Sequence, residues 1–227
     1  VIGIAGDVDP TEAVDLVQSY FGDISSGERP APPDVVEAER TGRKTELLAD
    51  PLARLPAIFL NHQAGGYGSV DFPTWEVVET LLLMGPSSRL YRRLVVDEAV
   101  AVQIGGGYEC YRGPGLFGLQ AITRDIESLD RVRECYLDEI QQLACAPVTL
   151  RELHKVHNQI RSAVIFGQQR PLSRAISLSR NVLFHDDPAF LDRYLERVIA
   201  VEPQQIQSLA ERWLDSGGEV DLRVIPR

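Results

Sequence analysis

The sequence has few cysteines, no long apolar run and no excess of basic residues, and each absence excludes a class of function. It has three cysteines, an odd number with no C-x-x-C pair, which argues against a disulfide framework or a cysteine zinc site and favours buried free thiols. Its apolar runs are far too short to span a membrane. The formal net charge of −10 argues against nucleic acid as the main partner, because phosphate recognition needs a basic face.

Familiar catalytic motifs are also missing. Neither H-x-x-E-H, H-E-x-x-H nor G-x-S-x-G occurs, and "GGGY" at 105–108 lacks the order of a phosphate loop. His154 and His157 lie three residues apart on one side of a predicted helix, but they lack a third zinc ligand, so a solvated helix face is favoured. His62 and His185, at element boundaries, are interpreted as structural. The residues alone therefore predict no catalytic group and no metal site in this chain.

What is present is an ordinary globular composition, with 44% hydrophobic and 25% charged residues. "VIGIAGDV" predicts a strand, and Asp9-Pro10 predicts the start of a helix that ends at Gly22. The proline-rich stretch after it is the clearest domain boundary. We predict the end of a preceding peptidase-like domain at 1–24, a linker at 25–42 and a larger domain at 43–227. The absence of a starting Met suggests a piece of a longer polypeptide.

The larger domain combines predicted strands with a block of helices. "KTELLAD", "PAIFLNHQ" and "EVDLRVIP" predict strands, and 101–123 predicts a hairpin around Arg112–Gly115. Helices are predicted at 69–85, 87–99 (with Ser87 or Ser88 as N-cap), 126–145, 171–184, 188–199 and 203–214, and Thr149–Glu152 is a capping box that opens another. The predicted fold is α+β, a largely antiparallel sheet with helices packed on one face.

Several stretches, taken in order, resemble one known family. They are "VIGIAGDVDPTEAVDLVQSYFGDI", a proline linker, "DFPTWEVVETLLLMGPSSRLYRRLVVDEAVAVQIGGGYECYRGPGLFGLQAITR" and "LRELHKVHNQIRSAVI". Together they resemble the C-terminal, non-catalytic half of the pitrilysin or mitochondrial-processing-peptidase family of inverted-motif zinc metallopeptidases. The resemblance implies two α+β halves that close around an unfolded peptide, with zinc held only in the missing or partner half.

The resemblance also implies where substrate-binding residues would lie. Many members carry an arginine and a tyrosine, seven residues apart, in a pattern similar to L-R-E-K-R-G-L-A-Y. On this sequence the pattern covers 94–102, and valines stand at both positions, Val95 and Val102. Valine cannot donate a hydrogen bond to a peptide carbonyl, so this clamp is lost. The preceding Ser88, Arg89 and Tyr91 are candidates for a chamber wall, whereas Arg92 and Arg93 are interpreted as solvated or bonded to helix ends.

The resemblance thus predicts a non-catalytic half that forms part of a peptide-binding chamber and docks onto a zinc-bearing half. The alternatives are an assembly or scaffold protein of the same fold, without a proteolytic role, and an unrelated α+β binding module. The parent is expected to be a zinc metalloendopeptidase, with this chain inactive alone. The expected partners are a peptide substrate and the catalytic half, with a homodimer as a further option, and no nucleic acid and no membrane span are expected. The compartment, bacterial periplasm or cytoplasm, stays open.

Overall fold

The computed structural model describes residues 1–28, 30–31, 33–38 and 40–227; positions 29, 32 and 39 of the predicted linker lie outside the described residues. The chain forms two compact units. We call residues 36–160 and 196–227 the body, and residues 1–35 and 161–195 the arm. The chain passes from body to arm and back within two helices, α5 (Leu150–Gly167) and α7 (Phe190–Ile199).

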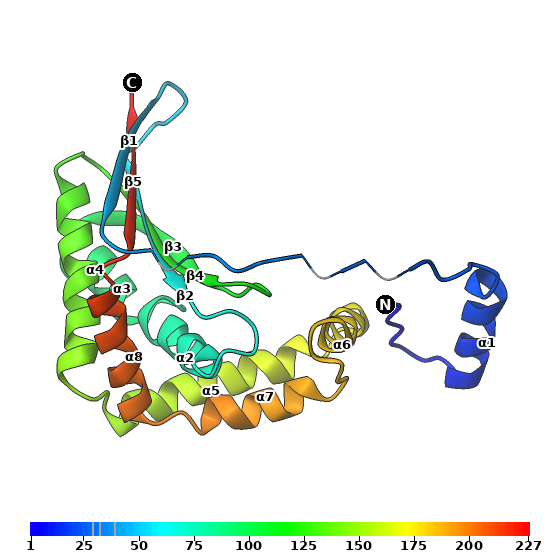
Figure 1. Cartoon of the computed structure of the whole chain (residues 1–227). Helices are drawn as coiled ribbons and strands as arrows, with labels where there is room; N and C mark the ends of the chain where they lie inside the picture. Colours follow the sequence, from blue (N-terminus) through cyan, green and yellow to red (C-terminus); the bar gives the residue numbers. More distant parts are fainter. Residues whose placement is uncertain (29, 32, 39) are drawn as a thin grey trace. The chain divides into compact units, whose positions relative to one another are not determined.

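The body is built on one five-stranded sheet (Figure 1). Its strands lie in the order β1-β5-β2-β4-β3, and only the β1–β5 pair is parallel. The bounds are Lys44–Asp50 for β1, Ala57–Ala64 for β2, Ala101–Glu109 for β3, Gly115–Thr123 for β4 and Glu219–Pro226 for β5. The predicted strands of this domain and the hairpin are confirmed. The α+β class is confirmed as well.

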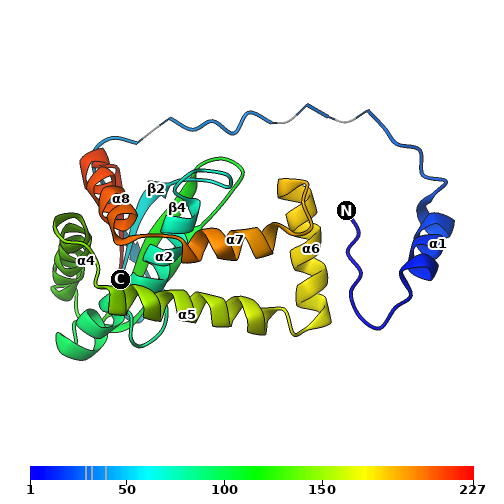
Figure 2. The ribbon, with the colours of Figure 1, turned by 90° about the horizontal axis from the view of Figure 1, so that it is seen from below.

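Three helices cover one face of this sheet: α2 (Phe72–Leu82), α4 (Ser128–Cys145) and α8 (Pro203–Ser216) (Figures 1 and 2). The burial of β2 alternates strictly, as expected for a strand with one face on a core. The predicted stripe of α4 is buried from Leu129 to Leu143, whereas Ile126 precedes the helix and is exposed. At the centre, Trp213 lies 4.9 Å from Trp75 and 4.8 Å from Phe117 between ring centroids, which gives the body an aromatic core.

The arm holds α1 (Pro10–Phe21), the end of α5, α6 (Pro171–His185) and the beginning of α7. In Figure 2, α6 joins the end of α5 to the start of α7. The start of α1 is as predicted: Asp9 Oδ1 accepts hydrogen bonds from the backbone N–H groups of Thr11 (2.8 Å) and Glu12 (3.0 Å). The strand predicted at 1–8 is wrong. These residues have no regular secondary structure, because no neighbouring strand pairs with them.

Two predictions about single side chains also need correction. The three cysteines are free, but only Cys135 is buried; Cys110 is half-buried and Cys145 is exposed. His154 is exposed as expected, whereas His157 is buried, so the two do not form one solvated face. Cys110 follows β3 in the turn before β4, and Cys145 is the last residue of α4, so neither is covered like Cys135. His157 lies on the side of α5 that also buries Leu153, Val156 and Ile160.

Candidate functional site

Residues 88–103, which we call the clamp segment, have an unusual backbone. The chain forms one helical turn, α3 (Arg89–Tyr91), which continues as a π-helix, η1 (Arg92–Asp97). Ala99 then has a φ of 53°, a left-handed conformation that favours glycine. The pairing of β3 with β4 is irregular between Ala101 and Gln103, which makes Val102 the extra residue of a β-bulge. π-helices, left-handed residues and bulges concentrate at functional sites, so this segment is the first candidate.

The polar groups at the start of this segment are engaged within the chain. Ser88 is buried, and its hydroxyl donates to the Gly85 carbonyl oxygen at 2.8 Å instead of capping α3. The Arg89 guanidinium donates to both carboxylate oxygens of Glu152, from Nε at 3.0 Å and from Nη2 at 3.1 Å. A bidentate pair of this kind fixes orientation strongly. Ser88 and Arg89 therefore tie the segment to its neighbours in this structure.

Arg93 anchors the π-helix to α4. Its guanidinium contacts Glu98 at 3.1 Å, Asp138 at 2.8 Å and Glu139 at 3.3 Å. Hydrogen bonds from Arg131, with further ones from Arg93, lower the pKa of Glu98 to about 2. Arg92 is exposed and pairs with Asp97, at 3.6 Å. The interpretation as a solvated side chain fits Arg92, whereas Arg93 bonds carboxylates in the middle of α4 and not a helix end.

The two valines predicted to stand at the family's clamp positions are accessible. Val102 is 46% exposed, Val95 is half-buried and Tyr91 is half-buried. Val102 is therefore not a core residue, which was the alternative to a chamber-facing position. Neither valine can form a hydrogen bond through its side chain. In the register of the family pattern, Ala99 stands where the family has glycine, and its positive φ fits that register.

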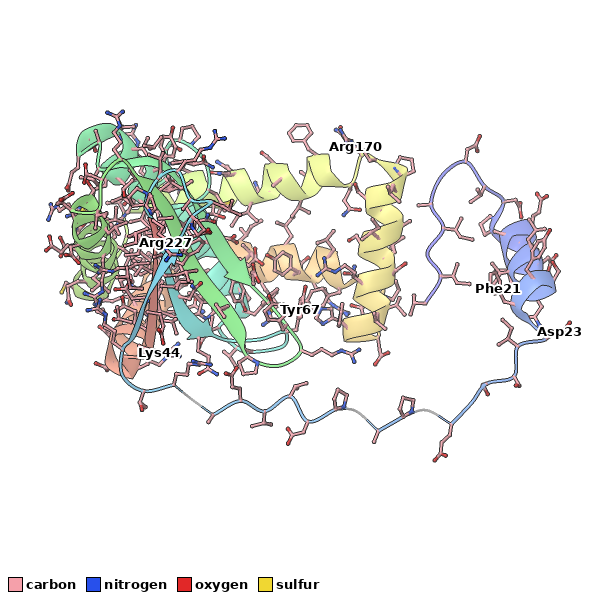
Figure 3. All side chains as sticks on the ribbon, turned by 90° about the horizontal axis from the view of Figure 1, so that it is seen from above. Phe21, Asp23, Lys44, Tyr67, Arg170 and Arg227 are labelled. Carbon is pink, nitrogen blue, oxygen red and sulfur yellow. The ribbon has the colours of Figure 1, made fainter. Side chains whose placement is uncertain are left out.

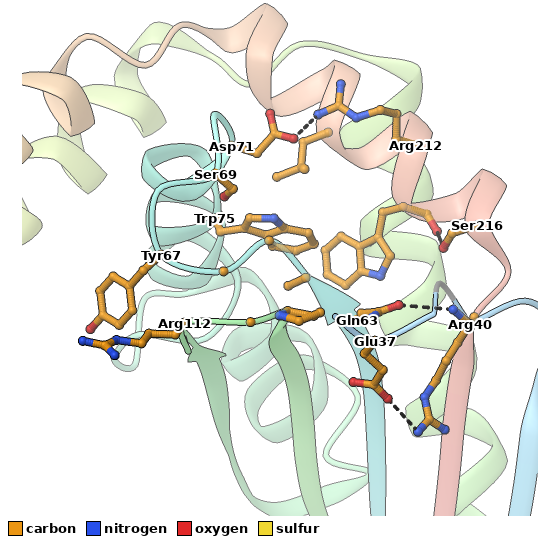
Figure 4. Close-up of a pocket in the computed structure, with 18 residues that line it drawn as sticks. Glu37, Arg40, Gln63, Tyr67, Ser69, Asp71, Trp75, Arg112, Arg212 and Ser216 are labelled. Atoms are coloured by element: carbon orange, nitrogen blue, oxygen red, sulfur yellow. Dashed lines mark hydrogen bonds and ion pairs between the residues drawn. The ribbon is translucent and has the colours of Figure 1, made fainter. Parts of the chain in front are cut away.

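A pocket of about 540 Å³ opens at one end of the sheet in the body (Figure 4). Its residues come from the linker end, from the loop after β2, from the β3–β4 turn and from α8, and they include both tryptophans, Trp75 and Trp213. Arg212 pairs with Asp71 at 2.7 Å, and the Arg40 backbone N–H donates to Gln63 at 3.2 Å. Sequence reasoning missed this pocket because its residues are distant in the chain; the only signal was that the sequence has just two tryptophans.

No zinc or other metal site can be assembled from the described residues. Among them no three His, Cys, Asp or Glu side chains form a group that could hold an ion. Burial is the main reason why the pKa of His62 is lowered to about 4, partly opposed by the carboxylate of Glu219. The His185 ring stacks on Phe190 with 3.4 Å between centroids. No helix among the described residues is long and apolar enough to cross a membrane.

The fold is an α+β domain with a largely antiparallel sheet, and its described residues form no metal-binding group. The profile of the peptidase M16 inactive domain matches residues 1–160, most of the chain. The chain therefore belongs to the peptidase M16 inactive-domain family. This confirms the resemblance to the pitrilysin and processing-peptidase family that the sequence motifs indicated.

Relatives and solved structures agree with this assignment. A protein of Mycobacterium leprae (strain TN), named an uncharacterized zinc protease, is 23% identical over 95% of this chain. The match covers 48% of that protein, so the chain spans about half the length of the curated relatives it matches. The crystal structure of a protease from Helicobacter pylori superposes with a TM-score of 0.87 at 18% identity, over 98% of this chain and 54% of that one. A chain of Complex III2 from Candida albicans gives 0.79 at 14% identity, over 96% and 53%.

Proposed function

We propose that this chain is the non-catalytic half of a zinc metallopeptidase of this family. In this proposal it docks onto a zinc-bearing half and closes with it around an unfolded peptide. Residues 1–24 would be the end of the preceding half, 25–42 the linker and 43–227 the inactive half itself. Catalysis would belong to the partner half, because the described residues here hold no metal-ligand set.

The observation that carries the proposal is the apolar surface of the arm. None of the residues of α1 is buried, although Val14, Leu16, Tyr20 and Phe21 are apolar or aromatic and more than half exposed. On α6, Leu172, Ile176 and Leu183 are all at least half exposed. Figure 3 draws the side chains of α1 as sticks, with Phe21 labelled. Extended apolar surfaces of this kind mark protein interaction sites.

The N-terminal segment of the arm lies against α6, so both would belong to one interface. Gly3 approaches α6 so closely that a Cβ atom on it would collide with the Ala175 carbonyl and the Ser179 hydroxyl. The extended N-terminal segment therefore already contacts the helix whose apolar residues are exposed. A preceding domain that contributed residues 1–24 would be positioned to cover both.

Within the clamp segment, the proposal gives different roles to the candidate residues. Tyr91, Val95 and Val102 would face the peptide, since their side chains are at least partly accessible. Ser88 and Arg89 would position the segment through Gly85 and Glu152. With valine at both clamp positions, a second protein would have to supply the missing hydrogen bonds to substrate.

Two measurements test the proposal. The isolated chain should contain no stoichiometric zinc and should not cleave a quenched unfolded peptide; one tight zinc per chain, lost when His154 and His157 are replaced, would contradict it. When the chain is mixed with an H-x-x-E-H half encoded beside it, amide hydrogen exchange in α1 and α6 should slow and cleavage should appear. Slow exchange before Ser25 in the isolated chain, independent of concentration, would show that the first segment needs no partner.

A scaffold protein of the same fold is the second candidate. The two valines at 95 and 102 favour it, because both hydrogen-bonding groups of the clamp are lost together. The fold likeness to a chain of Complex III2 from Candida albicans is compatible with it. The coding sequence upstream of Val1 separates the two: an H-x-x-E-H motif there supports the peptidase, and its absence supports the scaffold.

A further inference from the structure

One face of the body sheet is left uncovered by the described helices. Along β4, Phe117, Leu119 and Ala121 are buried under the helices, whereas the alternate residues Leu116 and Gln120 are exposed. The same alternation in β2 leaves Phe59, Asn61 and Gln63 only half-buried. Because strand side chains alternate between faces, these residues share the uncovered face.

A row of glycines makes a hollow in this face. The register places Asn61 opposite Gly118, and Gly118 opposite Gly107, so the central row of β2, β4 and β3 carries a single side chain. The adjacent rows carry larger side chains: Leu116 with Glu109 on one side, Gln120 with Phe59 on the other. The resulting hollow has a volume of about 230 Å³, and we call it the glycine trough. Its lining includes Phe59, Asn61, Gly106, Gly107, Glu109, Leu116, Gly118 and Gln120.

Glycine at position 118 leaves room in the trough for the Asn61 side chain. A Cβ atom on Gly118 would collide with the Asn61 carboxamide oxygen. A Cβ atom on Gly107 would instead point toward Glu79 of α2, so Gly107 borders the trough without a side chain directed into it. Glycine in a strand interior often marks the close approach of another chain or a ligand. The close approach at Gly118 is made by the Asn61 side chain, which therefore lies in the trough where a ligand can reach its carboxamide.

The size and lining of the trough select a kind of ligand. Small-molecule pockets usually measure about 300–1,000 Å³, so this hollow suits a single side chain better than a whole cofactor. Leu116 and Phe59 supply apolar walls, and the carboxamides of Asn61 and Gln120 can each donate and accept hydrogen bonds. Glu109 at the open edge, in a chain of net charge −10, favours a basic neighbour on the ligand.

We infer that the glycine trough binds one large apolar side chain, such as phenylalanine, of an extended basic peptide. The Asn61 and Gln120 carboxamides then bond the peptide backbone beside that side chain. The inference rests on the proposed function, since it makes the uncovered sheet face the peptide-binding wall of the inactive half. It names a side-chain preference that neither the fold nor the clamp segment supplies.

The test measures the binding of two fluorescein-labelled peptides to the chain by fluorescence anisotropy at low salt. One is Lys-Ala-Lys-Ala-Phe-Ala-Lys-Ala-Lys, and the other has alanine in place of phenylalanine. We expect the phenylalanine peptide to bind at least tenfold more tightly, as expected for burying one aromatic side chain. In proton–nitrogen NMR spectra, the amide signals of Gly107 and Gly118 should shift with this peptide.

Three variants locate the binding. Leu116→Trp fills the trough from its exposed wall and should reduce the preference for phenylalanine to less than threefold. Asn61→Ala should weaken both peptides equally and leave their ratio unchanged. The matched control is Leu48→Ala: Leu48 is 52% exposed on the same face, on β1 outside the trough, and this variant should bind like the original chain. Circular dichroism checks that each variant is folded.

Every other outcome overturns the inference. Equal binding of the two peptides would show that the trough does not bind the phenylalanine side chain. It would not contradict the proposed peptide-binding chamber. A phenylalanine preference that survives Leu116→Trp would place the site elsewhere, for example in the pocket near Trp75. No binding of either peptide at millimolar concentration would also refute the trough. The cleavage and docking measurements on the two halves judge the proposed function separately, because they do not need the isolated chain to bind peptide.

Discussion

The body and the arm share one chain, but they bury their apolar residues very differently. Among the described residues, every buried apolar side chain except that of Tyr194 lies in the body. The arm instead exposes apolar residues along α1, along α6 and in the extended segment before α1. Both regions contain regular amphipathic helices. Amphipathicity therefore shows that a helix needs a partner, but not whether this chain supplies it.

The difference can be tested most strongly with one substitution made in both regions. Leu82 in the body is fully buried, so Leu82→Ala should lower the free energy of unfolding by about 2–5 kcal/mol. Leu172 on α6 is 72% exposed, and Leu172→Ala should change it by less than about 0.5 kcal/mol. Urea unfolding followed by far-ultraviolet circular dichroism measures both, since the helices of the body and of the arm contribute to this signal. Similar losses would show that the arm has a core of its own in the isolated chain.

The core of the body should also make it sensitive to acid. The pKa of His62 is about 4 in the folded chain against 6.5 for an ordinary histidine. Between these values only the unfolded state binds the proton, so stability falls as the pH drops from 6.5 to 4, by about 3 kcal/mol in all. Urea unfolding across this range should show a slope that His62→Phe removes. An unchanged slope in the variant would assign the acid sensitivity to other groups.

The clamp segment sharpens the comparison, because it belongs to the body and yet is strained. Ala99→Gly should raise the free energy of unfolding by about 0.5–1 kcal/mol, since glycine accepts the positive φ that alanine resists. Ala146 is also exposed but has a φ of −146°, so Ala146→Gly should lower it by a similar amount. Thermal unfolding of the two glycine variants gives the sign of each change in the free energy of unfolding. If both variants were less stable than the original chain, Ala99 would not be strained in solution.

The smallest effect is expected at Val102, an exposed residue of the body. Val102→Tyr restores the family residue and should change the free energy of unfolding by less than about 0.5 kcal/mol. Its control, Val132→Tyr, inserts the same ring at a fully buried position of α4 and should cost at least about 1–3 kcal/mol. Melting temperatures distinguish them. A large drop for Val102→Tyr would mean that the bulge turns this side chain inward.

The sequence predicted well wherever a pattern is local. The apolar segment "PAIFLNHQ" predicted β2, and helical spacing with Asp9-Pro10 predicted α1. The Thr149–Glu152 capping box was correct because it depends on four consecutive residues. The same local reasoning failed at 1–8, where a β-branched segment has strand propensity but no strand to pair with. It also misplaced His157, since the spacing of two histidines says nothing about what packs over each.

For the candidate site, too, the sequence predicted some features and the tertiary structure decided others. The order of motifs in the sequence determined the family, the missing catalytic motif and the valines at positions 95 and 102. Only the tertiary structure could reveal the pocket around the two tryptophans and the glycine trough, because each joins residues from separate strands and loops. It also decided that Ser88 and Arg89 are engaged within the chain. Local propensity depends on neighbouring residues, whereas a cavity or a long-range ion pair forms only after distant segments have packed together.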